Sequence, residues 1–211
     1  MDKNQKHRKI TFYKHYFQDF FNKQSKKVKA KIVWTFDLIE DLQRVPETYL
    51  KHIENTDGLY EIRVQLSSDI FRIFCFFDQG QLVVLAQWFQ KKTQKTPKKE
   101  IELALKLKLN MKMINKNLIT LEEFKEKNYG VRGTKERDEL EAGYESFKIG
   151  ALIHDTRLEM GMTQEQLAEK VGTTKSYISK IENNIKEARI STLQKIVELG
   201  FGGRLELNIK I

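Results

Sequence analysis

The sequence predicts an α+β protein in two parts, a small mixed domain followed by an all-helical domain. Three observations predict this class. Short segments typical of antiparallel strands lie between positions 59 and 89, with helical spacing of apolar residues on either side. From position 147 to 200 the spacing is helical throughout. The net charge also changes between the two halves of the chain, which indicates two domains with different partners.

The excess of positive charge lies entirely in the first half of the 211-residue chain. Residues 1–112 contain 22 Lys and Arg against 13 Asp and Glu, whereas residues 113–211 contain 16 of each kind. A basic domain of this size favours a polyanion such as nucleic acid as its ligand. The alternative is a solvated, lysine-rich surface.

The composition also bears on compartment and cofactors. A hydrophobic content of 40% supports packed cores, and no run of about 18 apolar residues or signal peptide is evident, so we expect no membrane span. Cys75, the only cysteine, lies in an apolar run and predicts a buried thiol in a reducing cytoplasm. The four histidines lack metal-ligand spacing, and we expect neither a metal nor a cofactor.

The first domain is expected to contain helices, a sheet and a closing helix. Residues 12–42 have a helical pattern that predicts two helices packed as a hairpin. LYEIRVQL (59–66), IFRIFCFF (70–77) and LVVLAQWF (82–89) predict a three-stranded antiparallel meander. TPKKEIELALKLKL (96–109) predicts the C-terminal helix.

Cationic residues converge on one region of this expected sheet. Arg63 lies on the polar face of its strand, Arg72 interrupts an otherwise apolar strand, and Lys91 and Lys92 follow the third strand. Such cations, without a metal-ligand cluster, suit the stabilisation of a phosphate that gains negative charge. For Arg72 the alternative is a buried salt bridge, with Glu61 as the candidate partner.

These segments resemble a toxin family. GLYEIRV, FRIFCFF and LVVLAQWFQKKTQKTPKKEIELA are similar to the RelE and HigB toxins, in particular to the phage Gp49-like branch, over residues 9–110. The resemblance implies a metal-independent endoribonuclease that cuts messenger RNA on the ribosome. It implies that Arg63 and Arg72 stabilise the scissile phosphate, and that Lys91 and Lys92 hold RNA or assist as acid.

The second domain is expected to contain four short helices. The inner face of the first is formed by apolar residues at helical spacing, Ile149, Leu152, Ile153 and Leu158. Thr163 with Gln166 and Ser191 with Gln194 predict capping boxes that open the second and fourth helices. Thr174 is the expected cap of a third helix, whose narrow core stripe leaves a polar face exposed.

The segment TQEQLAEKVGTTKSYISKIENN (163–184) resembles the helix-turn-helix of the phage-repressor family, of Cro/C1 or XRE type. The resemblance implies that Gln164 and Asn183 hold DNA phosphates. It also implies that four residues meet base edges in the major groove: Thr174, Lys175, Ser176 and Lys180. The alternative is a four-helix domain that uses this surface for protein contact. Because residues 147–211 carry only ten basic against eight acidic residues, we expect a homodimer on a two-fold operator.

Two further segments complete the expected domain order of 1–112, 113–146, 147–200 and 201–211. Between residues 120 and 145, eight acidic residues stand against five basic ones. This segment either covers the cationic site or is a solvated linker, and its similarity to the extension of HigA antitoxins favours covering. RLELNIKI at the C-terminus alternates apolar and polar residues, which predicts a strand that pairs with the first domain or with a second copy.

These observations lead to two main functional hypotheses. The first is a fused toxin-antitoxin protein, in which a HigA-like part binds operator DNA, represses transcription and restrains the toxin at an effective concentration of about millimolar. The HigA-like part then contacts the toxin domain of its own chain or that of a second chain. The second is a DNA-binding regulator with an inactive first domain used for assembly or sensing. Gln87 favours it, because the toxins commonly have His there. A basic RNA-binding module without chemistry explains the charge but not the KKTQKTP match.

Overall fold

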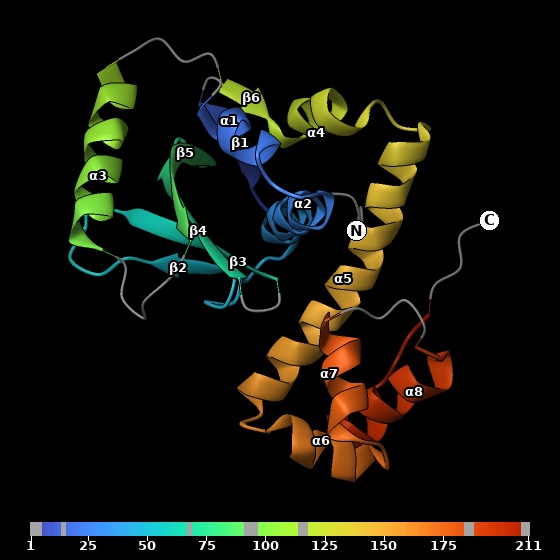
Figure 1. Ribbon diagram of the computed structural model, residues 1–211. Coiled ribbons are helices and arrows are strands. Elements are labelled where there is room, and N and C mark those ends of the chain that lie inside the picture. Colours follow the sequence, from blue (N-terminus) through green and yellow to red (C-terminus); the bar gives the residue numbers. More distant parts are fainter. Residues whose placement is uncertain are drawn as a thin grey trace. The chain divides into compact units, whose positions relative to one another are not determined.

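The computed structural model describes residues 6–13, 16–66, 69–90, 97–113, 118–183 and 188–207. The chain divides into two compact units, Met1–Leu140 and Glu141–Ile211 (Figure 1). A sheet with helices forms the first unit, and helices form the second, so the expected α+β class is confirmed. Among the described residues, no helix is long and apolar enough to cross a membrane.

The first unit contains a mixed sheet of six strands in the order β2-β3-β4-β5-β1-β6. The strands are β1 (Lys9–Tyr13), β2 (Leu50–His52), β3 (Leu59–Leu66), β4 (Asp69–Asp78), β5 (Gln81–Gln90) and β6 (Leu118–Thr120). Strands β3, β4 and β5 form the expected antiparallel meander, with an irregularity between Ile73 and Cys75. Strand β1 is parallel to β5 and antiparallel to β6, which the sequence did not predict.

The helical hairpin expected from residue 12 begins later in the chain. Phe12 belongs to strand β1, and the helices are α1 (Tyr16–Asn22) and α2 (Lys26–Asp41), the second capped by Ser25. The strand was missed because KITFY is short and buried on both faces, so its side chains lack a clear period of two. Its strand partners also lie far along the chain, and no local pattern indicates them.

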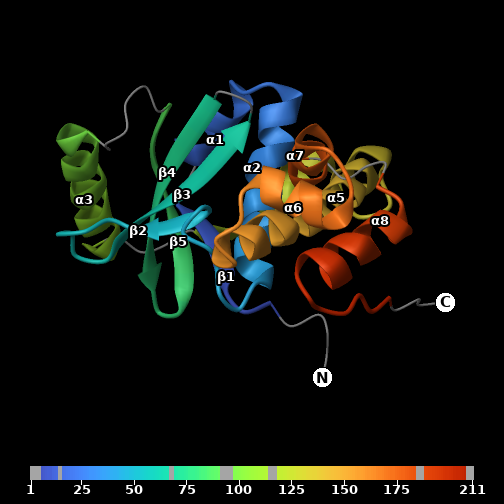
Figure 2. The same ribbon diagram turned by 90° about the horizontal axis from the view of Figure 1, so that it is seen from below.

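Helices cover both faces of the sheet. Helices α1, α2 and α4 (Leu121–Tyr129) pack on the face that carries Ile62 and Ile73. Helix α3 (Lys98–Met113) packs on the opposite face, against Phe74 and Phe76. Figure 2 shows α3 on one side of the strands and α2 on the other. Cys75 is buried as predicted, and this burial raises the pKa of its thiol well above the usual value.

Residues 118–140 belong to the first unit rather than to a separate linker. Strand β6 extends the sheet, and three apolar side chains of this segment enter the same core as α1 and α2: Leu121, Phe124 and Leu140. Helix α5 (Lys135–Glu159) begins in this segment and continues into the second unit. Residues 120–140, most of the acidic segment, are therefore part of the first unit.

The second unit contains the rest of α5, then α6 (Gln164–Val171), α7 (Lys175–Asn183), α8 (Ile190–Lys195) and the short π-helical turn η1 (Ile196–Gly200). Its core contains Ile153, Leu167, Ala168, Val171, Ile178, Ile181 and Ile196. The four expected helices are present.

Three details of this unit differ from expectation. Ile149, Leu152 and Leu158 are exposed rather than inward, whereas Ile153 lies in the core, and Gly150 allows α5 to approach α7 closely. Ser191 does not cap the fourth helix, because α8 already begins at Ile190. Residues 203–207 have no regular structure, and 208–211 lie outside the described residues, so the expected C-terminal strand is absent over its described part. A strand needs a neighbouring strand to form hydrogen bonds with its backbone N–H and C=O groups.

Candidate functional sites

Strands β3 and β4 place the two predicted arginines directly opposite one another. Arg63 and Arg72 lie on the same face as Glu61, which precedes Arg63 by two residues on β3. The Nε of Arg63 donates to Oε1 of Glu61 at 2.7 Å, and Nη1 of Arg72 donates to Oε2 at 2.6 Å. One carboxylate therefore bridges both guanidinium groups.

This cluster is largely closed to solvent. Glu61 is 2% exposed and Arg72 6%, whereas the side chain of Arg63 is 27% exposed. Burial raises the pKa of the Glu61 carboxyl, but hydrogen bonds from Arg72 and Arg63 outweigh this effect and lower the pKa below its usual value. The ionised carboxylate offsets much of the arginine charge. Of the three, the side chain of Arg63 is the most exposed to solvent.

The salt bridge that was the alternative role for Arg72 is present, and Glu61 also binds Arg63. The second contact was not predicted, although the two-residue spacing on a strand would have indicated it. Lys91 and Lys92 lie outside the described residues, and the side chain of Gln87 is also outside them.

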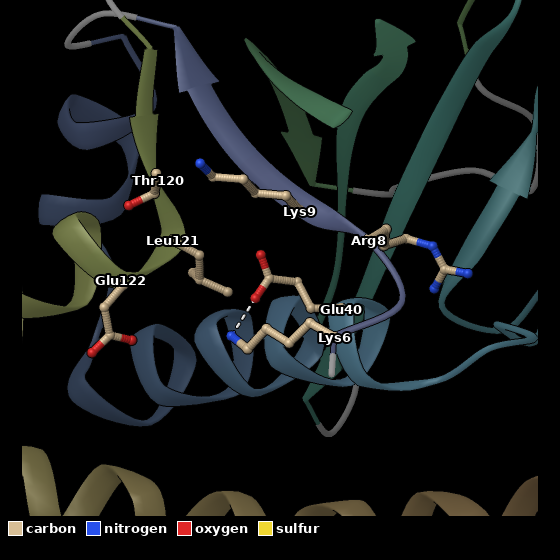
Figure 3. A pocket seen from close by; sticks show the side chains of 7 residues that line it. All are labelled: Lys6, Arg8, Lys9, Glu40, Thr120, Leu121 and Glu122. Atoms are coloured by element: carbon tan, nitrogen blue, oxygen red, sulfur yellow. Dashed lines mark hydrogen bonds and ion pairs between the residues drawn. The ribbon is translucent and has the colours of Figure 1, made fainter. Parts of the chain in front are cut away.

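The described part of the first unit has a pocket of about 420 Å³ at the edge formed by β1 and β6 (Figure 3). Its lining residues are Lys6, Arg8, Lys9, Glu40, Thr120, Leu121 and Glu122. Lys6 forms an ion pair with Glu40, which also accepts a hydrogen bond from the backbone of Ile10 at 2.7 Å. Arg8 donates to the carbonyl groups of Leu42 and Gln43 at 2.7 and 2.8 Å. Lys6 and Arg8 thus connect the end of α2 to the residues that precede β1. Of the predicted site residues within the described part of the chain, none lines the pocket.

In the second unit, the predicted caps place α6 and α7. Thr163 and Gln166 form the expected capping box, with Thr163 N donating to Gln166 Oε1 at 2.8 Å. Gly172 ends α6 in the left-handed conformation, with φ of 71°. Thr174 then accepts a hydrogen bond from Tyr177 N at 3.2 Å and caps α7. Two short helices joined by a tight turn form a helix-turn-helix.

Helix α7 separates an apolar inner face from a polar outer one. Ile178 and Ile181 are buried in the core as predicted. The outer residues predicted to contact DNA are exposed: Thr174, Lys175, Ser176, Lys180 and Asn183. Nζ of Lys175 lies 3.4 Å from Oε2 of Glu165, but both side chains are about 60% exposed, so this pair is weak. The outer face is thus open to an external ligand.

Gln164 and Asn183, the predicted phosphate contacts, lie at the ends of α6 and α7. The side-chain amide of Gln164 donates to Glu182 Oε2 at 2.8 Å, which uses one of its two N–H groups and leaves the other. The amide of Asn183 donates to the carbonyl of Ser179 at 2.8 Å. The contact to Glu182 fixes the position of the Gln164 amide and was not predicted. Among the described residues, no group of three or more His, Cys, Asp or Glu is placed to hold a metal.

Comparison with protein-family models gives two matches. Residues 19–108 match the family described as phage derived protein Gp49-like (DUF891), and residues 153–199 match the family described as helix-turn-helix. None of the curated proteins and none of the solved structures compared with the chain matches it. Both resemblances inferred from the sequence are confirmed. The chain therefore joins a Gp49-like, toxin-type domain to a Cro/C1-type helix-turn-helix, DNA-binding domain.

Proposed function

We propose that the chain is a cytoplasmic toxin-antitoxin fusion protein. Its helix-turn-helix unit binds operator DNA and represses transcription, and its Gp49-like unit is a ribosome-dependent messenger RNA endonuclease that the intact chain restrains. The observation that carries the proposal is the outer face of α7, which is polar and exposed while Ile178 and Ile181 anchor the helix in the core.

The DNA-binding role follows from the chemistry of this face. Lys175 and Lys180 supply donors for guanine O6 and N7 in the major groove, and Thr174 and Ser176 contribute hydroxyl groups. The remaining N–H of Gln164 and the N-terminus of α6 suit a phosphate oxygen.

A homodimer on a two-fold operator fits this unit. Its net charge gives one copy little affinity for the DNA backbone, and two copies double the phosphate contacts. Ile190 and Leu199, exposed by 59% and 60% at the C-terminal helices, offer apolar surface for a second copy.

The endonuclease role rests on the arginine pair. In such a reaction the ribose 2′-hydroxyl attacks the adjacent phosphorus atom, the bond to the 5′-oxygen breaks, and cations stabilise the added charge. Arg63 would contact the phosphate, with Lys91 and Lys92 holding RNA or assisting as acid, and the buried Arg72 would position the other groups. Because Glu61 already binds Arg63, an RNA phosphate must displace the Glu61 carboxylate before it can bind this arginine. This requirement is consistent with an enzyme whose activity is restrained in the intact chain.

A regulator without ribonuclease activity is the second candidate. The observation that favours it is the bridging carboxylate of Glu61, which holds both arginines, together with Gln87 in place of the His common in the toxins. In that case the Gp49-like unit serves assembly or sensing.

Cleavage of messenger RNA by the full chain on translating ribosomes tests the endonuclease role, with cut ends mapped by primer extension. We expect little cleavage by the parent chain and at least tenfold more by Glu61→Gln, because the substitution frees Arg63. Adding Arg63→Ala to that variant should abolish the cuts. The control is Glu54→Gln, which changes an exposed carboxylate of the same unit.

Folding of each variant is checked by circular dichroism. If Glu61→Gln does not fold, Glu61→Asp replaces it, since aspartate keeps a negative charge in the cluster while its shorter side chain weakens the contact with Arg63. Folded variants that leave the message intact favour the second candidate.

A further inference from the structure

We infer that the part of the first unit up to Met113, here called the Gp49-like part because it contains the matched residues 19–108, forms a single folding unit with the segment 118–140. Cutting the chain between the two therefore releases no free, folded Gp49-like domain. This inference concerns folding and holds whether or not the domain cleaves RNA. The matched Gp49-like region ends at residue 108, before the segment begins. Four kinds of contact carry the inference.

The first contact is backbone pairing at the edge of the sheet. Strand β6 pairs antiparallel with β1, next to which it lies in Figure 1. In this pairing Leu118 is opposite Tyr13, Ile119 is opposite Phe12 and Thr120 is opposite Thr11. The other edge of β1 is already paired with β5. Without β6, the backbone groups of β1 on this side lose their partners, and an unpaired edge strand is prone to pair with other chains.

The second contact is the ring of Phe124, which is 1% exposed. Its centroid lies 4.6 Å from that of Phe12, 4.9 Å from Phe21 and 5.7 Å from Phe17. These three residues come from β1 and α1, so Phe124 fills the space where the first strand and the first helix meet. Removing it leaves a void of phenylalanine size lined by aromatic rings.

The third contact is an ion pair between buried side chains. Asp37 of α2 is 7% exposed, and the Nζ of Lys125 lies 2.8 Å from its Oδ1. The Nζ of Lys6 is farther away, at 3.9 Å. Burial raises the pKa of Asp37, and Lys125 offsets this only in part. Without the segment, Asp37 loses its nearer counter-charge, and an uncompensated buried charge is costly.

The fourth contact is a set of hydrogen bonds along α1 and α2. Trp34 Nε1 donates to the carbonyl of Leu140 at 2.8 Å, and Gln18 Nε2 donates to Asn128 Oδ1 at 2.6 Å. The two donors lie on α1 and α2, and both acceptors lie in the segment 118–140. The contacts therefore extend from β6 to the start of α5.

None of these four contacts involves the arginine cluster. They lie along β1, α1 and α2, whereas Arg63 and Arg72 lie on β3 and β4, on the face covered by α3. The described part of the segment therefore completes the fold rather than covering the arginines. A protease that destroys the downstream half would unfold the Gp49-like part instead of freeing it.

The test uses the full chain with a recognition sequence for a site-specific protease inserted within residues 114–117. After complete cutting, the two pieces should co-elute in size-exclusion chromatography, and the thermal transition of the first unit should stay within a few degrees of its value in the uncut protein. Separation of the pieces, with a folded N-terminal piece that retains slow amide exchange, would overturn the inference.

Side-chain variants of the same cut protein sharpen this test. Phe124→Ala should weaken association of the pieces at least tenfold and cause the N-terminal piece to lose its transition. Phe77→Ala is the matched control, because that ring is 43% exposed and its loss should change neither readout. If the uncut Phe124→Ala chain does not fold while the uncut Phe77→Ala chain does, this result also supports the inference. An N-terminal piece that stays folded without Phe124 contradicts it.

A charge variant gives an independent measurement. Lys125→Met should lower the thermal midpoint of the uncut first unit and weaken association of the cut pieces, because Asp37 loses its partner. Lys127→Met, an exposed lysine of the same helix, is the control and should change neither. Equal effects of the two substitutions would contradict the role given to this ion pair. All of these readouts are independent of ribonuclease activity, so they separate this inference from the proposed function.

Discussion

Arg157 and Glu182 join the ends of α5 and α7 by two parallel hydrogen bonds. Nε of Arg157 donates to Oε1 of Glu182 at 2.6 Å, and Nη2 donates to Oε2 at 2.9 Å. Both residues are nearly buried, and Nη1 of Arg157 donates to the carbonyl of Met162 at 2.8 Å. Since Glu182 also accepts from Gln164, one charged cluster fixes α6 and α7 relative to α5.

Substitution of Glu182 by Gln should strongly destabilise the second unit. Breaking a buried ion pair leaves the Arg157 charge uncompensated, which costs about 3–5 kcal/mol. Urea unfolding followed by circular dichroism measures the change. The control is Glu165→Gln, which removes an exposed carboxylate and should change the free energy of unfolding by less than about 0.5 kcal/mol. Equal effects of the two substitutions would show that the buried pair has no special role.

Gly150→Ala should also destabilise the second unit. A Cβ at this position would lie 2.7 Å from the carbonyl oxygen of Ile181 and 2.8 Å from that of Glu182, so α5 and α7 must move apart. Overpacking of this kind costs about 1–3 kcal/mol. Thermal unfolding measures it, with Ser146→Ala one turn earlier as the control. A higher melting temperature for Gly150→Ala would mean that the close approach of the helices is wrong.

Two substitutions should affect DNA binding in different ways. Lys175→Ala should change the preferred sequence, because a lysine donor to guanine discriminates against the wrong base by about 1–3 kcal/mol. Gln164→Ala should weaken binding to all sequences alike, because the proposed contact of its amide is to a phosphate, which carries no sequence information. Selection from random DNA followed by titration of the selected sites separates the two effects. Lys170→Ala, an exposed lysine of α6, is the control. Unchanged binding in both variants would remove α7 from the interface.

Stability of the first unit should fall as the pH decreases from about 4.5 towards 2. Burial raises the pKa of the Glu122 carboxyl, but Lys125, Arg137 and Arg132 together lower it from 4.5 to about 2. The unfolded chain then binds a proton in this window that the folded chain does not, so acid favours unfolding.

Glu122→Gln should therefore flatten the dependence of the free energy of unfolding on pH between about 4.5 and 2. Asp37, whose pKa is raised chiefly by burial, acts in the opposite sense in both proteins. The control is Glu126→Gln, an exposed carboxylate of the same helix, which should keep the parent slope. Denaturant unfolding at several pH values gives these slopes, and an unchanged slope in Glu122→Gln would refute the assignment.

Local patterns predicted the helix-turn-helix well because its determinants lie close together in the sequence. The capping box of Thr163 and Gln166 spans three residues, and Gly172 ends α6 where the pattern indicated. Strands β1 and β6 were missed because each is short and its partner lies about 70 or more residues away. Long-range pairing of this kind leaves no periodic signal in the sequence.

The candidate sites were predicted only in part for a related reason. Residue type and spacing identified the exposed face of α7, and they identified Arg63 and Arg72 as neighbours. They did not show that Glu61 binds both arginines or that Glu182 holds Gln164. These contacts depend on side-chain geometry across strands and helices. The integration of residues 118–140 into the first unit was hidden as well, because their acidic composition resembles that of a solvated segment.

Nuclease protection of the DNA upstream of the chain's own coding region tests the proposed repressor role of the full chain. We expect protection of two half-sites about 10 base pairs apart, or a multiple of that spacing. Arg63→Ala should leave this protection unchanged, and the double substitution Lys175→Ala and Lys180→Ala should abolish it. No protection at micromolar protein and physiological salt, or protection that survives the double substitution, would contradict the proposed function.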